Sequence, residues 1–288
     1  MRSISTLKYA GIFLLILLAA PFALADVADD MKEAETLSKA GKYGQAEQSY
    51  QNVINKADPN EAGDIELAFQ ARRRLPLAYL ATDRQPQAQA AVMDMLAKNH
   101  DPPRLPHAVH EIVEEAKKLD LTLQAGQIYQ NILTAQPQHP QAVWLKMGVA
   151  IANAHLGNDS AVDSTLQNII AQHAEDDRAA EALGQAAWAY RKLNKNAQAR
   201  NVYQYVVDNW PDKDRAIFSQ RGLVLCSLAL DDDAAADAAL QKLLAEYDGS
   251  QYMAEIVRNI AGAYSKKGKA DEAATLHQYV VDKHPESP

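Results

Sequence analysis

The chain has 288 residues, 48% of them hydrophobic and 23% charged, which is an ordinary globular composition with room for one or two domains. Lys and Arg number 29 against 37 Asp and Glu, and the resulting net charge of −8 opposes non-specific binding to nucleic acid or anionic lipid. Cys226 is the single cysteine, so an internal disulfide is excluded.

Residues 1–25 have the layout of a secretory signal peptide. Arg2 and Lys8 give a positive start, an apolar stretch occupies residues 10–20, and a small-residue cleavage site ends at Ala25. An uncleaved membrane anchor is the alternative, but the apolar stretch is shorter than the ~20 residues that span a bilayer. We therefore expect cleavage after Ala25, a periplasmic or secreted location, and no stable membrane insertion afterwards.

A pattern recurs seven times along residues 26–288. Each copy has a small or β-branched anchor, a Gln five residues later in six of the seven copies, and an apolar pair seven and eight residues later. From the second copy onward the anchors are spaced by 37 residues. The anchors are Ala46, Ala88, Ala125, Val162, Ala199, Ala236 and Ala273. Because residues at i, i+4, i+7 and i+8 share one face of an α-helix, each copy predicts a helix at this place.

A turn and an earlier helix are predicted before each anchor. Five residues before the anchors stand residue types that tolerate a left-handed backbone, which helices commonly need where they end. These are Gly41, Asp83, Asp120, Gly157, Asn194, Asp231 and Gly268. Small residues predominate twelve positions before the anchors, which lets a neighbouring helix approach closely. Each copy therefore predicts a helix, a turn and a second helix.

Seven helix-turn-helix repeats follow from these columns after the predicted signal peptide. Their approximate bounds are 27–59, 64–102, 104–137, 141–174, 178–211, 215–248 and 252–285. The second repeat is the least regular, because Pro76 falls inside its first helix and removes a backbone hydrogen bond. We expect a kink or a late helix start there.

This pattern resembles the tetratricopeptide repeat. The family's order of a small residue, a tyrosine, an alanine, an aromatic residue and a proline is carried by Ala187, Tyr190, Ala199, Tyr203 and Pro211. The period of 37 residues departs from the family's usual ~34. The resemblance covers nearly all of the mature chain and implies an all-α, right-handed superhelical solenoid, with first helices on a concave face and second helices on a convex face. The long connections are similar to those of periplasmic tetratricopeptide proteins of the cell envelope.

Catalytic signals in the sequence are weak. Cys226 stands in an apolar segment with no basic neighbour, which is typical of a buried structural thiol. His107, His110 and Glu114 share a helical face, but the segment lacks the second histidine of the zinc-protease motif. We expect a solvated polar face there, with a weak metal site as the alternative. The sequence has no glycine-rich phosphate loop or nucleophile elbow, so we expect no enzyme, no cofactor and no bound metal.

The resemblance also implies that ligands bind on the concave face. The residues that map there are rich in arginines and aromatic side chains, which carry much of the binding energy in interfaces. They are Arg73, His110, Trp144, Met147, Trp188, Arg191, Phe218, Arg221, Leu225 and Arg258. The arginines favour an acidic or C-terminal peptide segment as the partner. The alternative is that they pair with local acids such as Glu181 and Glu255.

The C-terminal end provides a second candidate surface. The sequence stops just after the seventh repeat with no further capping helix, although solenoids usually need a polar cap. We expect Leu276, Val280 and Val281 to leave an apolar end surface for a partner or for a homo-oligomer. These features predict an exported scaffold for protein–protein interaction in the bacterial cell envelope. The alternative is a solenoid that binds a small envelope ligand, such as a peptide or glycan fragment.

Overall fold

The computed structural model describes residues 26–98, 104–211 and 214–286 and is built from α-helices throughout these ranges. The predicted signal peptide lies outside the described residues. The first helices of the repeats are α1 (Val27–Lys39), α3 (Ala62–Leu80), α5 (Leu105–Lys118), α7 (Ala142–His155), α9 (Asp177–Lys192), α11 (Asp214–Ala229) and α13 (Met253–Lys266). The second helices are α2 (Tyr43–Lys56), α4 (Gln85–Lys98), α6 (Thr122–Ala135), α8 (Asp159–His173), α10 (Asn196–Asn209), α12 (Asp233–Glu246) and α14 (Ala270–Lys283). The predicted all-α solenoid of helix pairs is confirmed.

The two columns that defined the repeat have direct structural roles. All seven residues of the turn column, from Gly41 to Gly268, have positive φ angles between 57° and 78°. The left-handed backbone therefore falls where each first helix ends, in aspartate and asparagine as well as in glycine. All seven anchors, from Ala46 to Ala273, are at most 3% exposed. Their small side chains let the paired helices pack closely.

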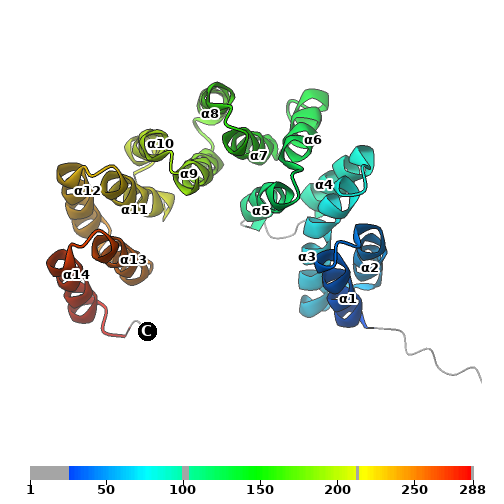
Figure 1. Ribbon diagram of the computed structural model, residues 1–288, viewed down its shortest axis with the longest axis horizontal. Helices are drawn as coiled ribbons and strands as arrows, with labels where there is room; N and C mark the ends of the chain where they lie inside the picture. The colour runs from blue at the N-terminus through cyan, green and yellow to red at the C-terminus, as the bar shows by residue number, and fades with distance from the viewer. Residues whose placement is uncertain (1–25, 99–103, 212–213, 287–288) are drawn as a thin grey trace, which may run out of the picture.

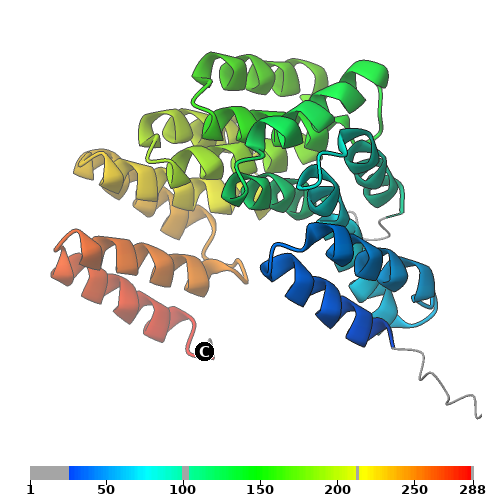
Figure 2. The same cartoon turned by 45° about the vertical axis from the view of Figure 1, so that its right-hand side comes forward.

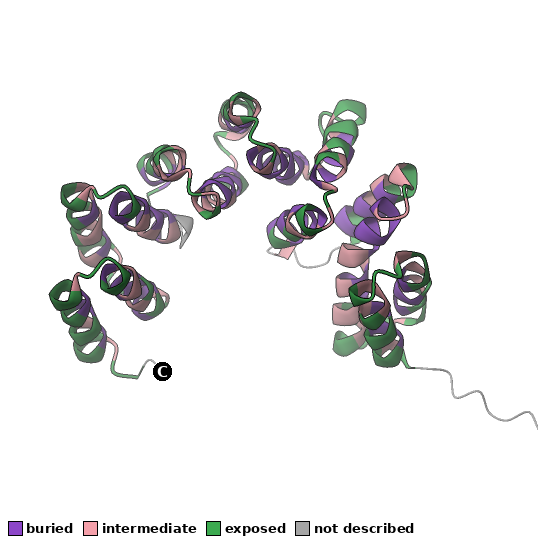
Figure 3. Cartoon of the chain, viewed as in Figure 1, coloured by how far each residue is buried: buried purple, intermediate pink, exposed green. Residues whose placement is uncertain are grey.

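The helix pairs stack into an open arch (Figure 1). The odd-numbered helices line most of the inner side and the even-numbered helices form the outer side. Burial follows this arrangement, since the outward faces of the even-numbered helices are largely exposed (Figure 3). One apolar core runs from α1 into α11 and a second continues from α11 to α14. The turned view in Figure 2 shows the helix pairs as successive layers.

Helix α7 is the most completely buried of the described helices. Every residue from Ala142 to Ala152 is buried, because α5, α6, α8 and α9 all pack against α7. Gly148 makes this possible: a Cβ atom placed there would lie 2.5 Å from the Tyr129 ring and 2.9 Å from Val109. Helices α5 and α9 also contact each other. The inner face of the fourth repeat is therefore covered by its neighbours.

The second repeat differs from the expectation. Helix α3 is the longest described helix, with 19 residues, and it continues through Pro76 to Leu80. The predicted late start is wrong. Pro76 is buried with its apolar neighbours, so packing compensates for the missing backbone donor. Within the described ranges, no helix has the length and apolar character needed to cross a bilayer.

Candidate functional site

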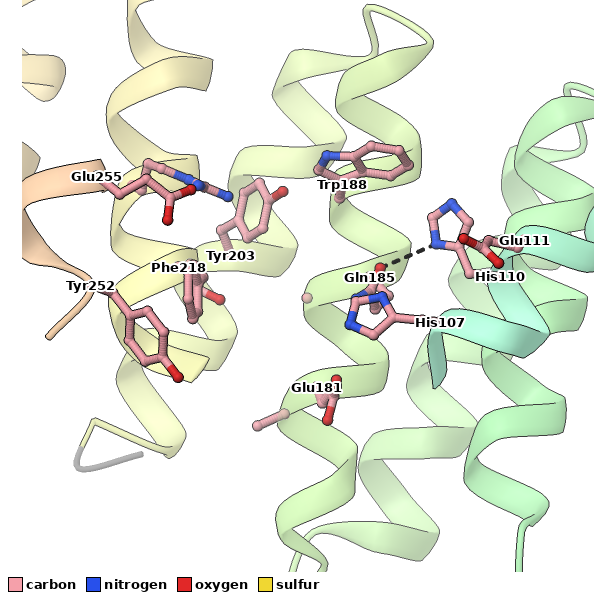
Figure 4. A pocket seen from close by; sticks show the side chains of 14 residues that line it. His107, His110, Glu111, Glu181, Gln185, Trp188, Tyr203, Phe218, Tyr252 and Glu255 are labelled. Carbon is pink, nitrogen blue, oxygen red and sulfur yellow. Dashed lines mark hydrogen bonds between the residues drawn. The ribbon is translucent and has the colours of Figure 1, made fainter. Parts of the chain in front are cut away.

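A cavity of 580 Å³ opens on the inner side of the arch, in the range that small-ligand and peptide-side-chain sites occupy. Its walls come from α5, α9, α10, α11 and the start of α13, so three consecutive repeats and a more distant one contribute. Figure 4 shows its labelled aromatic and carboxylate side chains arranged around the opening.

His110 joins two walls of this cavity. Its Nδ1 donates a hydrogen bond to Oε1 of Gln185 over 3.1 Å (Figure 4). Its ring also meets Trp188 edge-on, with the ring centroids 4.8 Å apart. Behind it, Nε2 faces Oε1 of Glu114 at 3.5 Å, and the same oxygen accepts a 2.6 Å hydrogen bond from His155. Burial lowers the pKa of His110 below its usual value, so the imidazole is neutral at pH 7.

The opposite walls are aromatic. Phe218 on α11 and Tyr252 at the start of α13 pack with ring centroids 5.1 Å apart and a tilt of 53°. Tyr203 reaches the cavity from α10, and its ring lies directly against the backbone of Gly222. Burial raises the pKa of Tyr203 to about 12, so its hydroxyl stays protonated. The cavity therefore offers ring faces from three elements.

Arg221 is the one arginine that lines the cavity. Its guanidinium carbon lies 5.4 Å from the centroid of the Phe218 ring, within the range of a cation–π contact. Burial lowers its pKa, and the nearby Tyr203 and Glu255 oppose that shift. The Arg221 guanidinium thus interacts with other residues of the cavity wall.

Three carboxylates complete the lining. Glu111 lies on α5, Glu181 on α9 and Glu255 on α13 (Figure 4). Glu111 also forms an ion pair with Arg73 of α3, beside a smaller cavity of 60 Å³ that shares Glu111 as a wall. The lining therefore holds three carboxylates against one guanidinium.

The structure brings together some of the predicted groove residues and separates others. His110, Trp188, Phe218 and Arg221 line the cavity. The predictions for Trp144 and Met147 are wrong, because both are buried beneath α5 and α9 at 3% and 0% exposure. The remaining four predicted residues lie outside the cavity lining, namely Arg73, Arg191, Leu225 and Arg258.

Those four residues have other surroundings. Arg73 pairs with Glu111, as the alternative of local pairing anticipated. Arg191 interacts with the Tyr203 hydroxyl behind the cavity wall. Leu225 is half-buried against the second apolar core, and Arg258 is half-buried on α13.

Several lining residues were not expected from the sequence. His107 and Glu111 belong to the segment that was expected to be a solvated polar face, and Tyr203 was noted only as the aromatic residue of the repeat pattern. Tyr252 directly precedes α13, and no pattern in the sequence marked it. Glu181 and Glu255 had been considered only as partners for arginines.

His110 and Cys226 are both buried side chains. His110 is 6% exposed, so the predicted solvated face is wrong at that residue, because α9 packs over it. No group of three or more His, Cys, Asp or Glu side chains in the described ranges is placed to hold a metal ion. Cys226 is a free, fully buried thiol, which confirms its structural interpretation. Burial raises its pKa to about 11.

The predicted C-terminal end surface is mostly wrong. Leu276 and Val280 are 4% and 5% exposed and belong to the second apolar core, because α14 turns them towards α13. Val281 alone is exposed, at 63%. One exposed valine does not make an apolar patch of the size that marks an interface.

Comparison with known proteins gives one sequence match. Residues 181–213, which include most of α9 and all of α10, match the model of the tetratricopeptide repeat. No curated protein sequence matches the chain significantly.

Several solved structures are similar in fold. A tetratricopeptide repeat protein from Parabacteroides merdae is 14% identical, with 90% of this chain and 93% of that chain covered and a TM-score of 0.41. PilW, a type IV pilus biogenesis factor, is 16% identical over 80% of this chain and 98% of its own, with a TM-score of 0.39. The C-terminal part of a repeat protein from Cytophaga hutchinsonii is 17% identical over 89% and 96%, with a TM-score of 0.38. These likenesses are too distant to support an argument about function.

The matched segment is one copy of the repeat. The matched helix pair is one of seven that share the left-handed turn residue and the buried anchor. The described ranges therefore form a solenoid of seven similar helix pairs, one of which matches the tetratricopeptide repeat model.

Proposed function

We propose that this protein is a scaffold that binds a segment of a partner protein in the inner cavity. Repeats of this family typically serve as scaffolds for protein–protein interaction and are generally not catalytic. The observation that carries the proposal is the convergence of Trp188, Phe218 and Tyr252 on one cavity that also holds charged groups. Aromatic anchors in a pocket with a few placed polar groups are what an interface needs at its centre.

The cellular location is part of the proposal. A positive start, an apolar stretch and a small-residue site before Asp26 support export, with the scaffold acting in the bacterial envelope. Expression of the full chain in a bacterial host tests this step. Mass spectrometry of the periplasmic fraction should find a mature chain that begins at Asp26, whereas an intact N-terminus in the cytosol would contradict it.

Gly184 allows the cavity to be filled without disturbing its walls. It lies on α9 at the cavity, and the nearest atom to an added Cβ would be Oγ of Ser219, 3.8 Å away. The substitution Gly184→Leu should therefore occupy the cavity and keep the helix, since leucine has a higher helix propensity than glycine. Capture of the partner from an envelope fraction, identified by crosslinking and mass spectrometry, should be lost in this variant.

Gly262 provides the matched control. It lies within α13 outside the cavity, and an added Cβ would meet no atom within 4 Å. Gly262→Leu makes the same change of side chain elsewhere and should retain capture. Retention of capture by both variants would remove the inner cavity as the binding site.

A small envelope ligand is the second candidate. The cavity volume of 580 Å³ and its ring faces also suit a peptide or glycan fragment. Thermal-shift measurements with oligosaccharides and with peptides distinguish the two candidates. Stabilisation by oligosaccharides that Gly184→Leu abolishes, with no protein captured, would favour the small ligand.

A further inference from the structure

The charges around the inner cavity carry information about its occupant. Counting the histidines as neutral, the lining residues include Glu111, Glu181 and Glu255 against Arg221 alone. The lining residues alone therefore carry an excess of two negative charges, while Arg73 and Lys192, which both lie outside the lining, contact Glu111 and the Trp188 ring. This is the opposite of the arginine-rich surface that the sequence alone suggested.

Arg221 already interacts with other side chains of the same chain. Its guanidinium lies over the Phe218 ring, and the nearby Tyr203 and Glu255 interact with its charge. A ligand carboxylate that approached Arg221 would compete with Glu255. It would also meet two further carboxylates around the same opening, and like charges at this distance in a partly buried site are unfavourable.

The aromatic side chains of the cavity also favour a positively charged ligand over a negatively charged one. The faces of aromatic rings carry a negative quadrupole, so they attract cations and repel anions. Trp188 illustrates this within the chain, because the Lys192 ammonium lies 5.0 Å from the centroid of its ring. Phe218 and Tyr252 together present a tilted pair of rings on the opposite wall. A Lys or Arg side chain can pack its aliphatic stem on such rings and place its charged end near a carboxylate.

We propose that the inner cavity recognises a basic segment of the partner, in which a Lys or Arg side chain enters between Trp188 and the Phe218–Tyr252 pair and is held by Glu181 and Glu255. This inference rests on the proposed function. The net charge of −8 for the whole chain supports it, because a negative protein attracts a basic segment at long range.

Selection from a random peptide library on phage tests the charge of the preferred ligand. The mature wild-type protein is the target, and Gly184→Leu serves to discard peptides that bind elsewhere. We expect the retained peptides to be enriched in Lys or Arg beside an apolar residue. Enrichment in Asp or Glu, or indifference to charge, would overturn the basic inference and leave peptide binding intact. Failure to retain any peptide that Gly184→Leu excludes would overturn the proposed function itself.

Glu181→Gln combined with Glu255→Gln tests the local carboxylates. A selected peptide, measured by calorimetry, should bind this double variant about tenfold more weakly or worse, because it loses both charged contacts. Glu175→Gln combined with Glu246→Gln is the matched control, since both residues are exposed and lie outside the cavity lining. Equal losses in the two double variants would assign the effect to net charge and overturn the local site. Thermal unfolding of both establishes that they remain folded.

Discussion

His110 and Gln185 join helices that are two repeats apart. The 3.1 Å hydrogen bond from Nδ1 to Oε1 runs between α5 and α9, over the buried helix α7. In a solenoid each repeat ordinarily contacts only its neighbours. This bond therefore closes the inner face over the fourth repeat and sets the position of one cavity wall relative to the next.

Removal of the acceptor should destabilise the fold. In Gln185→Ala the buried Nδ1–H of His110 loses its partner, and an unsatisfied buried donor costs roughly 1–3 kcal/mol. The free energy of unfolding, measured with urea, should fall by about 1 kcal/mol or more. Gln167→Ala, at an exposed position of α8, is the control and should change it by less than about 0.5 kcal/mol. Equal effects would show that the His110 contact does not stabilise the closure.

Stability should also depend on pH through His110. Burial lowers its folded-state pKa below the unfolded value of 6.5, so the unfolded state binds its proton first as the pH falls. The free energy of unfolding should therefore decrease as the pH drops from 6.5 towards the lowered pKa, and this group should cause no further loss below it. Glu114, whose pKa is lowered, contributes stability that is lost at more acidic pH, below its unfolded value of 4.5.

The variant His110→Gln isolates this contribution. His139 and His173 also have pKa values lowered mainly by burial, and they add a slope of the same sign. Urea denaturation at pH 7.5 and pH 5.5 should show a smaller difference in His110→Gln than in the wild type. An unchanged difference would assign the slope to the other histidines.

The helix pairs could be predicted because their signals are local. A left-handed turn residue and a small anchor act within one helix pair, so their chemistry appears at fixed spacing in the sequence. All seven turn residues have the expected positive φ, from Gly41 to Gly268. The buried anchors, from Ala46 to Ala273, have the same basis. The late helix start that Pro76 predicted is wrong for the opposite reason. Packing of α3 against residues outside its own segment supports the helix.

The cavity could be predicted only in part, because it depends on contacts between distant repeats. Projecting each first helix onto a uniform inner face gave Met147 and Arg221 equivalent positions. In the structure Met147 is fully buried under α5 and α9, while Arg221 lines the cavity. No spacing within one repeat reveals that α5 and α9 meet. Tyr203 was missed because a single ring can fill the core and also reach the cavity.

The turn column itself can be tested by exchanging residue types. Asp120 has a φ of 57°, where a side chain strains the backbone, so Asp120→Gly should raise the free energy of unfolding by up to about 1 kcal/mol. Gly157 has a φ of 76° in the equivalent turn, and Gly157→Ala should lower it by about 1 kcal/mol. An added Cβ at Gly157 meets no atom within 4 Å, so only the backbone conformation opposes it. Changes of the same sign in both variants would contradict this explanation.

Gly222 should be essential for the position of Tyr203. A Cβ atom at this residue would lie 2.5 Å from Cε2 of Tyr203, and its three nearest heavy atoms would all belong to that ring. Gly222→Ala should therefore lower the free energy of unfolding by roughly 1–3 kcal/mol and displace a cavity wall, reducing partner binding as well. Gly262→Ala introduces the same methyl group where no atom lies within 4 Å, and it should be neutral or stabilising. Chemical denaturation of the two variants measures the difference.

Cys226 should report on opening of the core between α10 and α11. The thiol is fully buried, and burial raises its pKa to about 11, so at pH 7 it is both inaccessible and protonated. The native protein should react with a thiol-specific disulfide reagent only through opening of the structure, and denaturant should accelerate the reaction. In Gly222→Ala the labelling rate should rise, because the displaced Tyr203 ring interacts with this thiol. Gly262→Ala should label at the wild-type rate. Rapid labelling of the native wild-type protein would show that the thiol is reached without opening the core.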